Sequence, residues 1–156
     1  MQFRLRDATN ADLPRIVAIE RRAFAHPWAE EAFHRELTLS FSRIVLGVTD
    51  QNDLGGYLCR WLIADECHIL NVAVDTKYRR QGLGELLMRE AIAEAVAKRV
   101  AIVTLEVRRS NTAARCLYRK LAFEERRLRK NYYGQGEDAI VMERRLTLTT
   151  KNRTSF

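Results

Sequence analysis

Residues 71–87 read NVAVDTKYRRQGLGELL, which is an apolar strand, a loop with two glycines and the beginning of a helix. Gly82 and Gly84 lie where the helix starts, and a residue without a Cβ lets a ligand come close to the backbone. A helix N-terminus also presents unpaired N–H groups and a partial positive charge. This stretch therefore predicts a cradle for an anionic ligand.

The glycine loop alone does not identify the anion. Its motif, R-x-x-G-x-G from Arg79 to Gly84, is weak because short glycine stretches at helix starts are often only turns. The sequence has neither the lysine–serine pair of a P-loop nor the G-x-G-x-x-G of a dinucleotide site. Its setting is more specific, since the helix is followed by an apolar strand, VAIVTLEV at 100–107, with a carboxylate, Glu106, near its end.

Composition limits the class of protein. The chain has 156 residues, of which 47% are hydrophobic and 30% charged, as is typical of one soluble globular domain. No apolar run approaches the roughly 18 residues of a membrane span. The first ten residues also lack the apolar stretch of a signal peptide. We therefore expect a cytoplasmic protein that does not bind a membrane.

The cysteines and histidines indicate neither a disulfide framework nor a metal site. Cys59, Cys67 and Cys116 show no C-x-x-C spacing, and the three histidines are scattered without the spacing of metal ligands. We expect all three cysteines to be buried and reduced, and the protein to use no metal.

Hydrophobic periodicity predicts one α/β (α+β) domain over residues 1–146, with a mixed, mostly antiparallel sheet of six to seven strands and helices on both faces. Strands are expected at 2–6, 43–49, 55–64, 67–75, 100–107, 123–130 and 139–146, with a turn at 131–138. Helices are expected after a capping box formed by Thr9 and Asp12, and at 29–37, 84–98 and 112–122. The polar residues 147–156 are expected to form a loose tail.

Two of these helices should each bury an apolar face. The core residues expected on the first helix are Leu13, Ile16, Val17, Ile19 and Ala23. Those expected on the long helix at 84–98 are Leu86, Leu87, Ala91, Ala95 and Val96.

Together these segments resemble the GNAT superfamily of N-acetyltransferases over about residues 2–146. In that superfamily this strand, loop and helix bind acetyl-coenzyme A, so the resemblance implies the GNAT fold and acetyl transfer. It implies that the pyrophosphate is held by backbone N–H groups of Arg79, Arg80, Gln81, Gly82, Leu83 and Gly84. It also implies that the pantetheine arm lies alongside Val72, Ala73 and Val74, where the family's fourth strand separates from the fifth.

Four longer stretches narrow the resemblance to the RimI family of ribosomal protein alanine N-acetyltransferases. They are HPWAEEAF at 26–33, DECHILNVAV at 65–74, VTLEVRRSNTAARCLYRKLAF at 103–123 and RKNYYGQGEDAIVM at 129–142. The chain departs from this family at Ala122, where the family usually has a glycine that suits a left-handed helix terminus. We expect a slightly different turn there and unchanged chemistry.

Acetyl transfer from a thioester to an amine needs a base for the ammonium proton, a donor for the oxyanion and an acid for the thiolate. The resemblance assigns the base to Glu106, acting directly or through water, and the acid to Tyr118. Asn111 would hydrogen-bond the cofactor, and it lies seven positions before Tyr118, so the two side chains can share one helix face. A backbone N–H near Val72 would hold the oxyanion. The alternatives are that Glu106 is a surface carboxylate and that Tyr118 is a core residue.

In related N-terminal acetyltransferases the first interhelical loop and the last hairpin form the peptide groove. Here these segments contribute Pro27, Trp28, Tyr132 and Tyr133, although Trp28 and one tyrosine could equally be core residues. The resemblance implies a monomer that acetylates the N-terminal alanine of a small-subunit ribosomal protein. An α-amine, with a pKa near 8, is easier to deprotonate at neutral pH than lysine, near 10.4, by about 3 kcal/mol.

Two other functions stay open at this point. One is a GNAT enzyme that acetylates lysine side chains or small amines. The other is a binding module that holds RNA or a ribosomal surface through a net charge of +7 and the cluster RRLRK at 126–130. We prefer to interpret these basic clusters as solvated faces and as phosphate contacts to coenzyme A, so we do not expect nucleic-acid binding.

Overall fold

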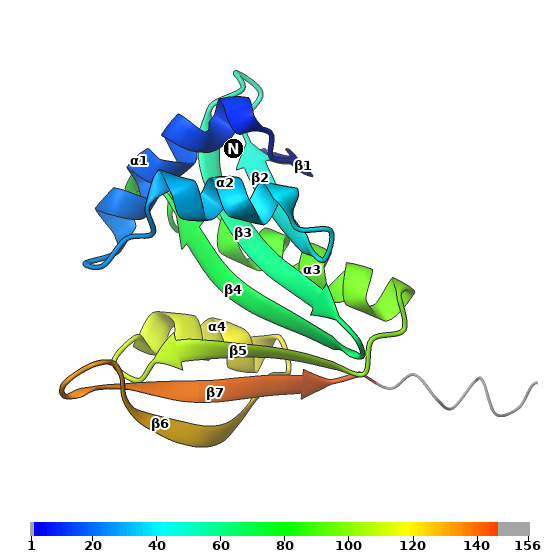
Figure 1. Ribbon diagram of the computed structural model, residues 1–156, viewed down its shortest axis with the longest axis vertical. Helices are drawn as coiled ribbons and strands as arrows, with labels where there is room; N and C mark the ends of the chain where they lie inside the picture. The colour runs from blue at the N-terminus through cyan, green and yellow to red at the C-terminus, as the bar shows by residue number, and fades with distance from the viewer. Residues whose placement is uncertain (1, 147–156) are drawn as a thin grey trace, which may run out of the picture. The chain divides into compact units, whose positions relative to one another are not determined.

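The computed structural model describes residues 2–146 and contains one seven-stranded sheet, in the order β1-β2-β3-β4-β5-β7-β6 (Figure 1). The strands are β1 (Arg4–Asp7), β2 (Ser42–Val48), β3 (Leu54–Ile63), β4 (Glu66–Val74), β5 (Ile102–Arg108), β6 (Glu124–Gly134) and β7 (Glu137–Arg145). The helices are α1 (Leu13–Ala23), α2 (Glu30–Thr38), α3 (Leu83–Ala97) and α4 (Thr112–Lys120), with 3-10 turns η1 (Asn10–Asp12) and η2 (Thr76–Tyr78).

The sheet is mixed, as the sequence predicts. β4 pairs with β5 in parallel, whereas the pairs β1–β2, β2–β3, β5–β7 and β6–β7 are antiparallel. The expected fold class is therefore confirmed. The chain divides into two compact units, which among the described residues comprise 2–61 with 70–91 and 62–69 with 92–146.

The first unit contains β1, β2, most of β3, the end of β4, and helices on both faces of these strands. In Figure 1, α1 and α2 cover one face, and the beginning of α3 lies on the other. Four of the five core residues predicted on α1 are buried, and Ala23 packs against them. The cluster that they join is Leu13, Ile16, Val17, Ile19, Phe33, Ile44, Leu46, Val48, Leu54, Tyr57, Cys59 and Ala73.

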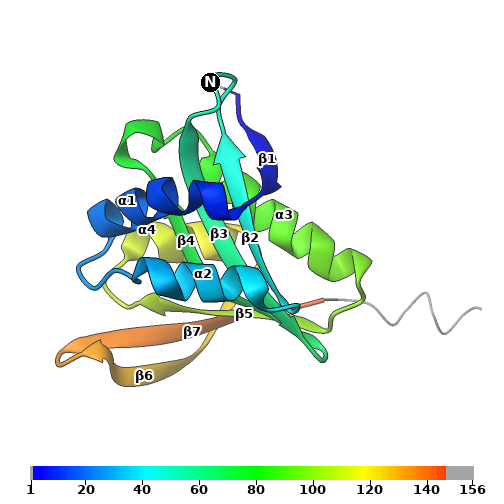
Figure 2. The same cartoon turned by 45° about the horizontal axis from the view of Figure 1, so that its top comes forward.

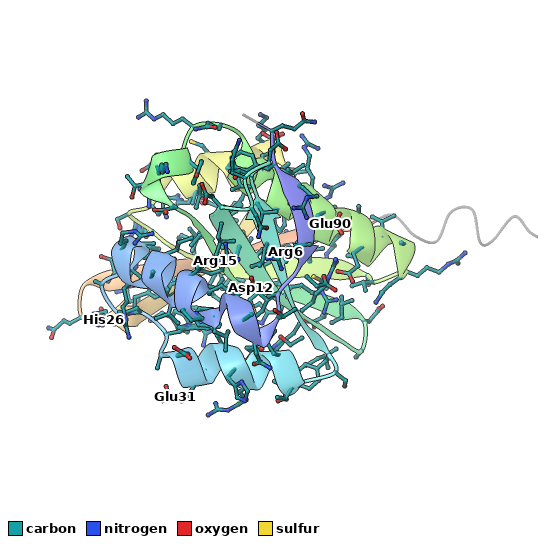
Figure 3. The ribbon with its side chains drawn as sticks, turned by 90° about the horizontal axis from the view of Figure 1, so that it is seen from above. Arg6, Asp12, Arg15, His26, Glu31 and Glu90 are labelled. Atoms are coloured by element: carbon teal, nitrogen blue, oxygen red, sulfur yellow. The ribbon has the colours of Figure 1, made fainter. Side chains whose placement is uncertain are left out.

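The predicted capping box of Thr9 and Asp12 is present, and it caps the beginning of η1, the 3-10 turn directly before α1. Asp12 also accepts hydrogen bonds from Arg6 at 2.8 Å and from Arg15 at 2.9 Å, and Figure 3 labels all three side chains. The hydrogen bond from the Arg6 guanidinium is the main reason that the pKa of Asp12 lies well below its usual range. The start of α1 is thus fixed by charge as well as by its cap.

The first residue of α3, Leu83, lies on a floor of three glycines from β2 and β3, which we call the glycine floor (Gly47, Gly55 and Gly56). A Cβ at Gly47 would overlap Leu83 Cδ1, and one at Gly55 would lie 3.0 Å from Leu83 Cδ2. A Cβ at Gly56 would lie 2.6 Å from the carbonyl oxygen of Ala73 in β4. Because these positions carry no side chain, Leu83 is buried directly against backbone and sets where the helix begins.

The second unit contains the beginning of β4, the end of α3, β5, α4 and the hairpin of β6 and β7, which Figure 2 shows from a second direction. The turn predicted over 131–138 is wrong in length, because β6 continues to Gly134 and β7 begins at Glu137. The Asn131 backbone N–H donates to Asp138 Oδ1 at 2.9 Å, and its side-chain oxygen accepts from the Gly136 N–H at 2.7 Å. These bonds hold the strand ends together across an irregular register.

Two core assignments on α3 are wrong. Leu86 and Val96 are exposed, whereas Leu87, Ala91 and Ala95 are buried as predicted. The buried stripe also includes Leu83, Met88 and Ile92. At 100° per residue, Leu86 and Val96 fall outside this stripe.

The cysteine prediction is correct for two of the three residues. Cys59 and Cys67 are buried thiols, but Cys116 is exposed. The reason is its element, since α4 buries none of its residues fully.

The prediction of a different turn at Ala122 is also wrong. Ala122 adopts the left-handed conformation, with φ at 70°, that a glycine would have taken. Its N–H donates to the Arg119 carbonyl and the Phe123 N–H donates to the Tyr118 carbonyl, both at 2.9 Å. These two bonds form the Schellman motif that ends many helices. The alanine therefore keeps the turn and tolerates its strain.

Candidate functional site

The glycine loop lies between η2 and α3 in the first unit. Arg80 and Gly82 both have positive φ, at 64° and 83°, and the Leu86 N–H donates to the Gly82 carbonyl at 3.0 Å. The helix hydrogen-bond pattern therefore begins at Gly82, and the N–H groups of the first turn are left for an outside acceptor. A Cβ at Gly82 would meet nothing within 4 Å, so the space beside the loop is open.

The loop is anchored to the end of β4. Arg79 donates from Nε to the Val74 carbonyl at 3.1 Å, so its side chain is held back along the strand. Tyr78 is buried, and its hydroxyl donates to Asp53 at 3.3 Å. Together with the glycine floor under Leu83, these contacts hold both ends of the loop.

Glu106 lies near the end of β5 in the second unit, where both of its carboxylate oxygens have partners. Oε1 lies 2.9 Å from His68 Nε2, and Oε2 lies 3.4 Å from Arg129 Nη1. The Glu106 side chain is only 15% exposed. The hydrogen bond with His68 is the main reason that its pKa lies below the ordinary glutamate value. Glu106 is thus a carboxylate at neutral pH and can accept a proton.

Sequence reasoning missed His68 and Arg129 as partners of Glu106. It treated the histidines as scattered and Arg129 as part of an exposed basic cluster. The signal lies in the register, because β4 pairs with β5 so that His68 stands opposite Thr104, two residues before Glu106 on the same face. That register cannot be known before the two strands are paired.

Tyr132 and Tyr133 lie near the end of β6, next to the same carboxylate. Their rings meet edge to face at 5.0 Å, with Arg129 4.3 Å from the centre of the Tyr132 ring and Arg108 4.3 Å from that of Tyr133. Burial, followed by the negative charge of Glu106, raises the pKa of Tyr133 to about 12. Tyr132 is exposed and Tyr133 half-buried, so Tyr132 presents the more accessible ring.

Tyr118 lies in α4, and Asn111 is the residue directly before this helix. Burial raises the pKa of Tyr118 to about 12, so its phenol stays protonated and can donate a proton. Tyr118 and Glu106 both affect the titration of Tyr133, which places these three groups in one electrostatic cluster. Asn111 caps α4, since its side-chain oxygen accepts the Ala114 N–H at 3.1 Å. Its amide N–H₂ group is the part that can donate to a ligand.

Pro27 and Trp28 lie between α1 and α2 in the first unit. Pro27 is exposed, whereas the Trp28 ring packs 5.1 Å from that of Phe33 against the core. The Trp28 backbone N–H donates to Glu20 Oε2 at 3.0 Å. Trp28 is therefore at least partly a core residue, which was one of the two alternatives open from the sequence.

Glu20 is a buried carboxylate that sequence reasoning also missed. Besides Trp28, its donors are the Tyr57 hydroxyl and Asn71 Nδ2, the latter at 2.8 Å. The signal was present, because Glu20 lies four residues after Ile16 on the apolar face of α1. A charged residue at such a position marks a buried polar contact.

The described residues contain neither a cluster of side chains that could hold a metal ion nor a helix long and apolar enough to cross a membrane. The basic cluster at 126–130 is partly paired within its own unit. Arg126 lies 3.5 Å from Glu143, and Arg129 contacts Glu106.

Comparison with known proteins gives consistent matches. The ribosomal protein bS18-alanine N-acetyltransferase of Escherichia coli (strain K12) is 40% identical over 137 residues, which cover 84% of this chain and 89% of the relative. The enzyme of the same name from Salmonella typhimurium is 38% identical over 137 residues, covering 86% and 91%. The crystal structure of the Escherichia coli S18-alanine N-acetyltransferase superposes with a TM-score of 0.88 at 34% identity, covering 97% of this chain and 98% of that one.

The family assignment agrees with the strand, loop and helix from which the sequence analysis began. Residues 13–123 match the acetyltransferase (GNAT) family, and this range contains the glycine loop, Glu106 and Tyr118. The chain therefore belongs to the acetyltransferase (GNAT) family and is an acyltransferase.

Proposed function

We propose that this enzyme transfers the acetyl group of acetyl-coenzyme A to the N-terminal alanine of a small-subunit ribosomal protein, the counterpart of S18 in its relatives. The observation that carries this proposal is the 40% identity to an enzyme of that name over 84% of the chain. The cluster of Glu106, Tyr118 and Tyr133 supplies a base and an acid of the kind that the reaction needs. We propose that residues 1–146 form the catalytic domain and that it acts as a monomer.

The glycine loop fits the pyrophosphate of coenzyme A. Positive φ at Arg80 and Gly82 curls the loop, and the first turn of α3 adds N–H groups with the positive end of the helix dipole. The exposed Arg80 adds positive charge beside them. Residues 79–84 would hold the diphosphate, and Val72, Ala73 and Val74 would lie along the pantetheine arm.

The acidic and phenolic side chains account for the proton transfers. Acetyl-coenzyme A supplies an acetyl thioester. Glu106 takes one proton from the substrate ammonium, directly or through water, which frees the amine to attack. A backbone N–H near Val72 stabilises the charge that develops on the carbonyl oxygen, and Asn111 donates to the cofactor. Tyr118 gives its proton to the departing sulfur, which its raised pKa allows because the phenol remains protonated at neutral pH. The second proton that the nitrogen loses as the amide forms returns to the phenolate through water.

An α-amine suits a base of this strength better than a lysine does. The lowered pKa of Glu106 makes it a weak base, so it takes a proton more easily from an ammonium group with a lower pKa. The difference between the two amines is about 3 kcal/mol at neutral pH. We propose that Pro27, Trp28, Tyr132 and Tyr133 bind the peptide, with the exposed Tyr132 ring and the Pro27 loop as its first contacts.

Mass spectrometry of a peptide panel incubated with acetyl-coenzyme A tests the proposal. The panel contains an alanine-starting peptide of the S18 type, the same peptide with its N-terminus blocked and an internal lysine, and small free amines. We expect one acetyl group on the first peptide and little on the others. Acetylation of the blocked peptide or of free amines alone would contradict the proposal.

Substitution of the two tyrosines tests the peptide site. We expect Tyr132→Ala or Tyr133→Ala to raise KM for the peptide while KM for acetyl-coenzyme A stays the same. An unchanged peptide KM in both variants would remove the tyrosines from the site.

A further inference from the structure

The carboxylate of Glu106 has a histidine beside it that is neither the base nor the acid of the proposed reaction. His68 lies on β4, and its Nε2 is 2.9 Å from Glu106 Oε1. The His68 side chain is 33% exposed and that of Glu106 is 15% exposed. The carboxylate end of this contact is therefore largely shielded from water. A shielded hydrogen bond constrains a side chain more than an exposed one does.

A catalytic carboxylate on a long side chain needs something to hold it. Glutamate has three side-chain torsions, and a base that samples several rotamers spends less time in reach of its proton. The pairing of β4 with β5 fixes the backbone at His68, which stands opposite Thr104, and its side chain has only two torsions. The His68 side chain is thus more rigid than that of Glu106.

The other partner of Glu106 is less suited to this task. Arg129 reaches Oε2 at 3.4 Å, near the limit of a hydrogen bond, and its side chain is 42% exposed. Its guanidinium is also shared with the face of Tyr132. Arg129 can therefore leave Oε2 more readily than His68 can leave Oε1.

We propose that His68 is a positioning residue for acetyl transfer: its Nε2–H donates to Oε1 and fixes the Glu106 carboxylate so that Oε2 accepts the proton of the substrate ammonium. The role as stated rests on the proposed function, because it assigns the base of that reaction. The proton balance is simple, since the ammonium N–H bond breaks, an O–H bond forms at Oε2, and the carboxylic acid then returns this proton to water. His68 keeps its own proton throughout.

Other charged and titratable groups surround the pair, and they bear on any pH measurement. They are Arg129, Tyr132 and Tyr133 from β6, Arg108 from β5, Glu143 from β7 and Tyr118 from α4. Glu143 stands opposite Thr104 and pairs with Arg126. None of these groups is changed by a substitution at His68, so a shift in the titration of Glu106 reports the loss of the imidazole.

The test compares His68→Ala with His68→Gln, which retains an N–H donor on a side chain of similar reach. We expect His68→Ala to lower kcat about ten- to a hundredfold, with KM for acetyl-coenzyme A unchanged, and His68→Gln to recover much of the loss. His34→Ala is the matched control, because His34 in the first unit hydrogen-bonds Asn10 at 2.9 Å, outside the site, and should leave kcat unchanged. Thermal unfolding of each variant separates a loss of folding from a loss of rate.

A second measurement does not depend on activity. In protein labelled with ¹³C at the glutamate carboxyl groups, the Glu106 signal, assigned by its absence in Glu106→Gln, should titrate at higher pH in His68→Ala than in the native chain. His68→Gln should restore most of the shift. Wild-type kcat and an unmoved Glu106 titration in His68→Ala would overturn the proposal. If the native chain acetylates no peptide but the titration moves, the proposed function fails while the contact between His68 and Glu106 stands.

Discussion

Glu20 in the first unit and Glu106 in the second are both shielded carboxylates, but their partners differ in kind. Glu20 is 1% exposed and accepts hydrogen bonds from three neutral donors: the Tyr57 hydroxyl, the Asn71 amide and the Trp28 N–H. Glu106 is 15% exposed and faces an imidazole and a guanidinium, of which the guanidinium is itself exposed.

The contrast shows how one residue type serves two purposes. The Glu20 carboxylate joins three elements, and burial, followed by the hydrogen bond to Glu20, raises the pKa of Tyr57 far above its ordinary value. Glu106 has one oxygen whose partner can move away, so it can exchange a proton with a substrate. A fully buried carboxylate with three donors stabilises a fold, whereas one with a replaceable partner can perform chemistry.

The largest expected effect is on rate, from Glu106→Gln. The amide cannot take up the ammonium proton, so we expect kcat to fall by roughly 10²- to 10⁴-fold. The thermal unfolding temperature should change little, because the side chain keeps its size and can still contact His68. Steady-state kinetics with an alanine-starting peptide measures the effect, and a variant with full rate at every pH would show that Glu106 is not the base.

The reverse outcome is expected from Glu20→Ala. The substitution leaves three buried donors without an acceptor, so we expect the free energy of unfolding to fall by about 3 kcal/mol or more. Urea denaturation of the native chain and the variant measures this difference. Glu20→Gln is the matched control and should lose less, since it retains one acceptor oxygen. A kcat that collapses in correctly folded Glu20→Gln would break the distinction between the two carboxylates.

A smaller expected effect is the pH dependence of the contribution that Glu106 makes to the free energy of unfolding. Because the pKa of Glu106 is lower in the folded protein than in the unfolded chain, its ionised form stabilises the fold above the ordinary glutamate pKa. This contribution is lost as the pH falls through the lowered value. The difference in unfolding free energy between the native chain and Glu106→Gln should therefore shrink on acidification below pH 5. A difference that stays constant down to pH 3 would show that the pKa is not lowered.

The smallest expected effect is a gain in stability, from Ala122→Gly, without a change in rate. A left-handed alanine costs about 1–2 kcal/mol, and glycine loses about 0.5–1 kcal/mol in chain entropy. Ala122→Gly should therefore stabilise the protein by about 0.5–1 kcal/mol. Neither carboxylate is touched, so kcat should not change. Thermal unfolding that shows a destabilised variant would contradict the assignment of strain to Ala122.

Sequence reasoning found what depends on local pattern. The strand, loop and helix at 71–87, the capping box of Thr9 and Asp12 and the strands at 43–49 and 55–64 are all coded by neighbouring residues, and the structure contains them. The candidate base and acid came from the resemblance of the segment at 103–123 to a known family. Their roles remain predictions.

What sequence reasoning missed depends on contacts between distant segments. The partnership of His68 with Glu106 needs the register of β4 with β5, and that of Glu20 needs α1 to be seated on β3 and β4. Leu86 and Val96 were misplaced for a simpler reason. Apolar residues lie on nearly every side of α3, so its sequence alone does not define which stripe is buried.

The glycine floor limits how the helix start can adapt. A side chain that shrinks inside an ordinary core leaves a space that its neighbours can partly fill by changing rotamers. Beneath Leu83 the neighbours at Gly47, Gly55 and Gly56 have no rotamers to change. Shortening Leu83 would thus leave a void that the glycines could fill only by main-chain movement. A side chain at Gly47 or Gly55 would push Leu83 and the helix outward, and one at Gly56 would push against the Ala73 carbonyl of β4. A change in the position of the first turn of α3 thus involves the strands beneath it. Very few substitutions at Leu83 and the three glycines would keep that turn in place.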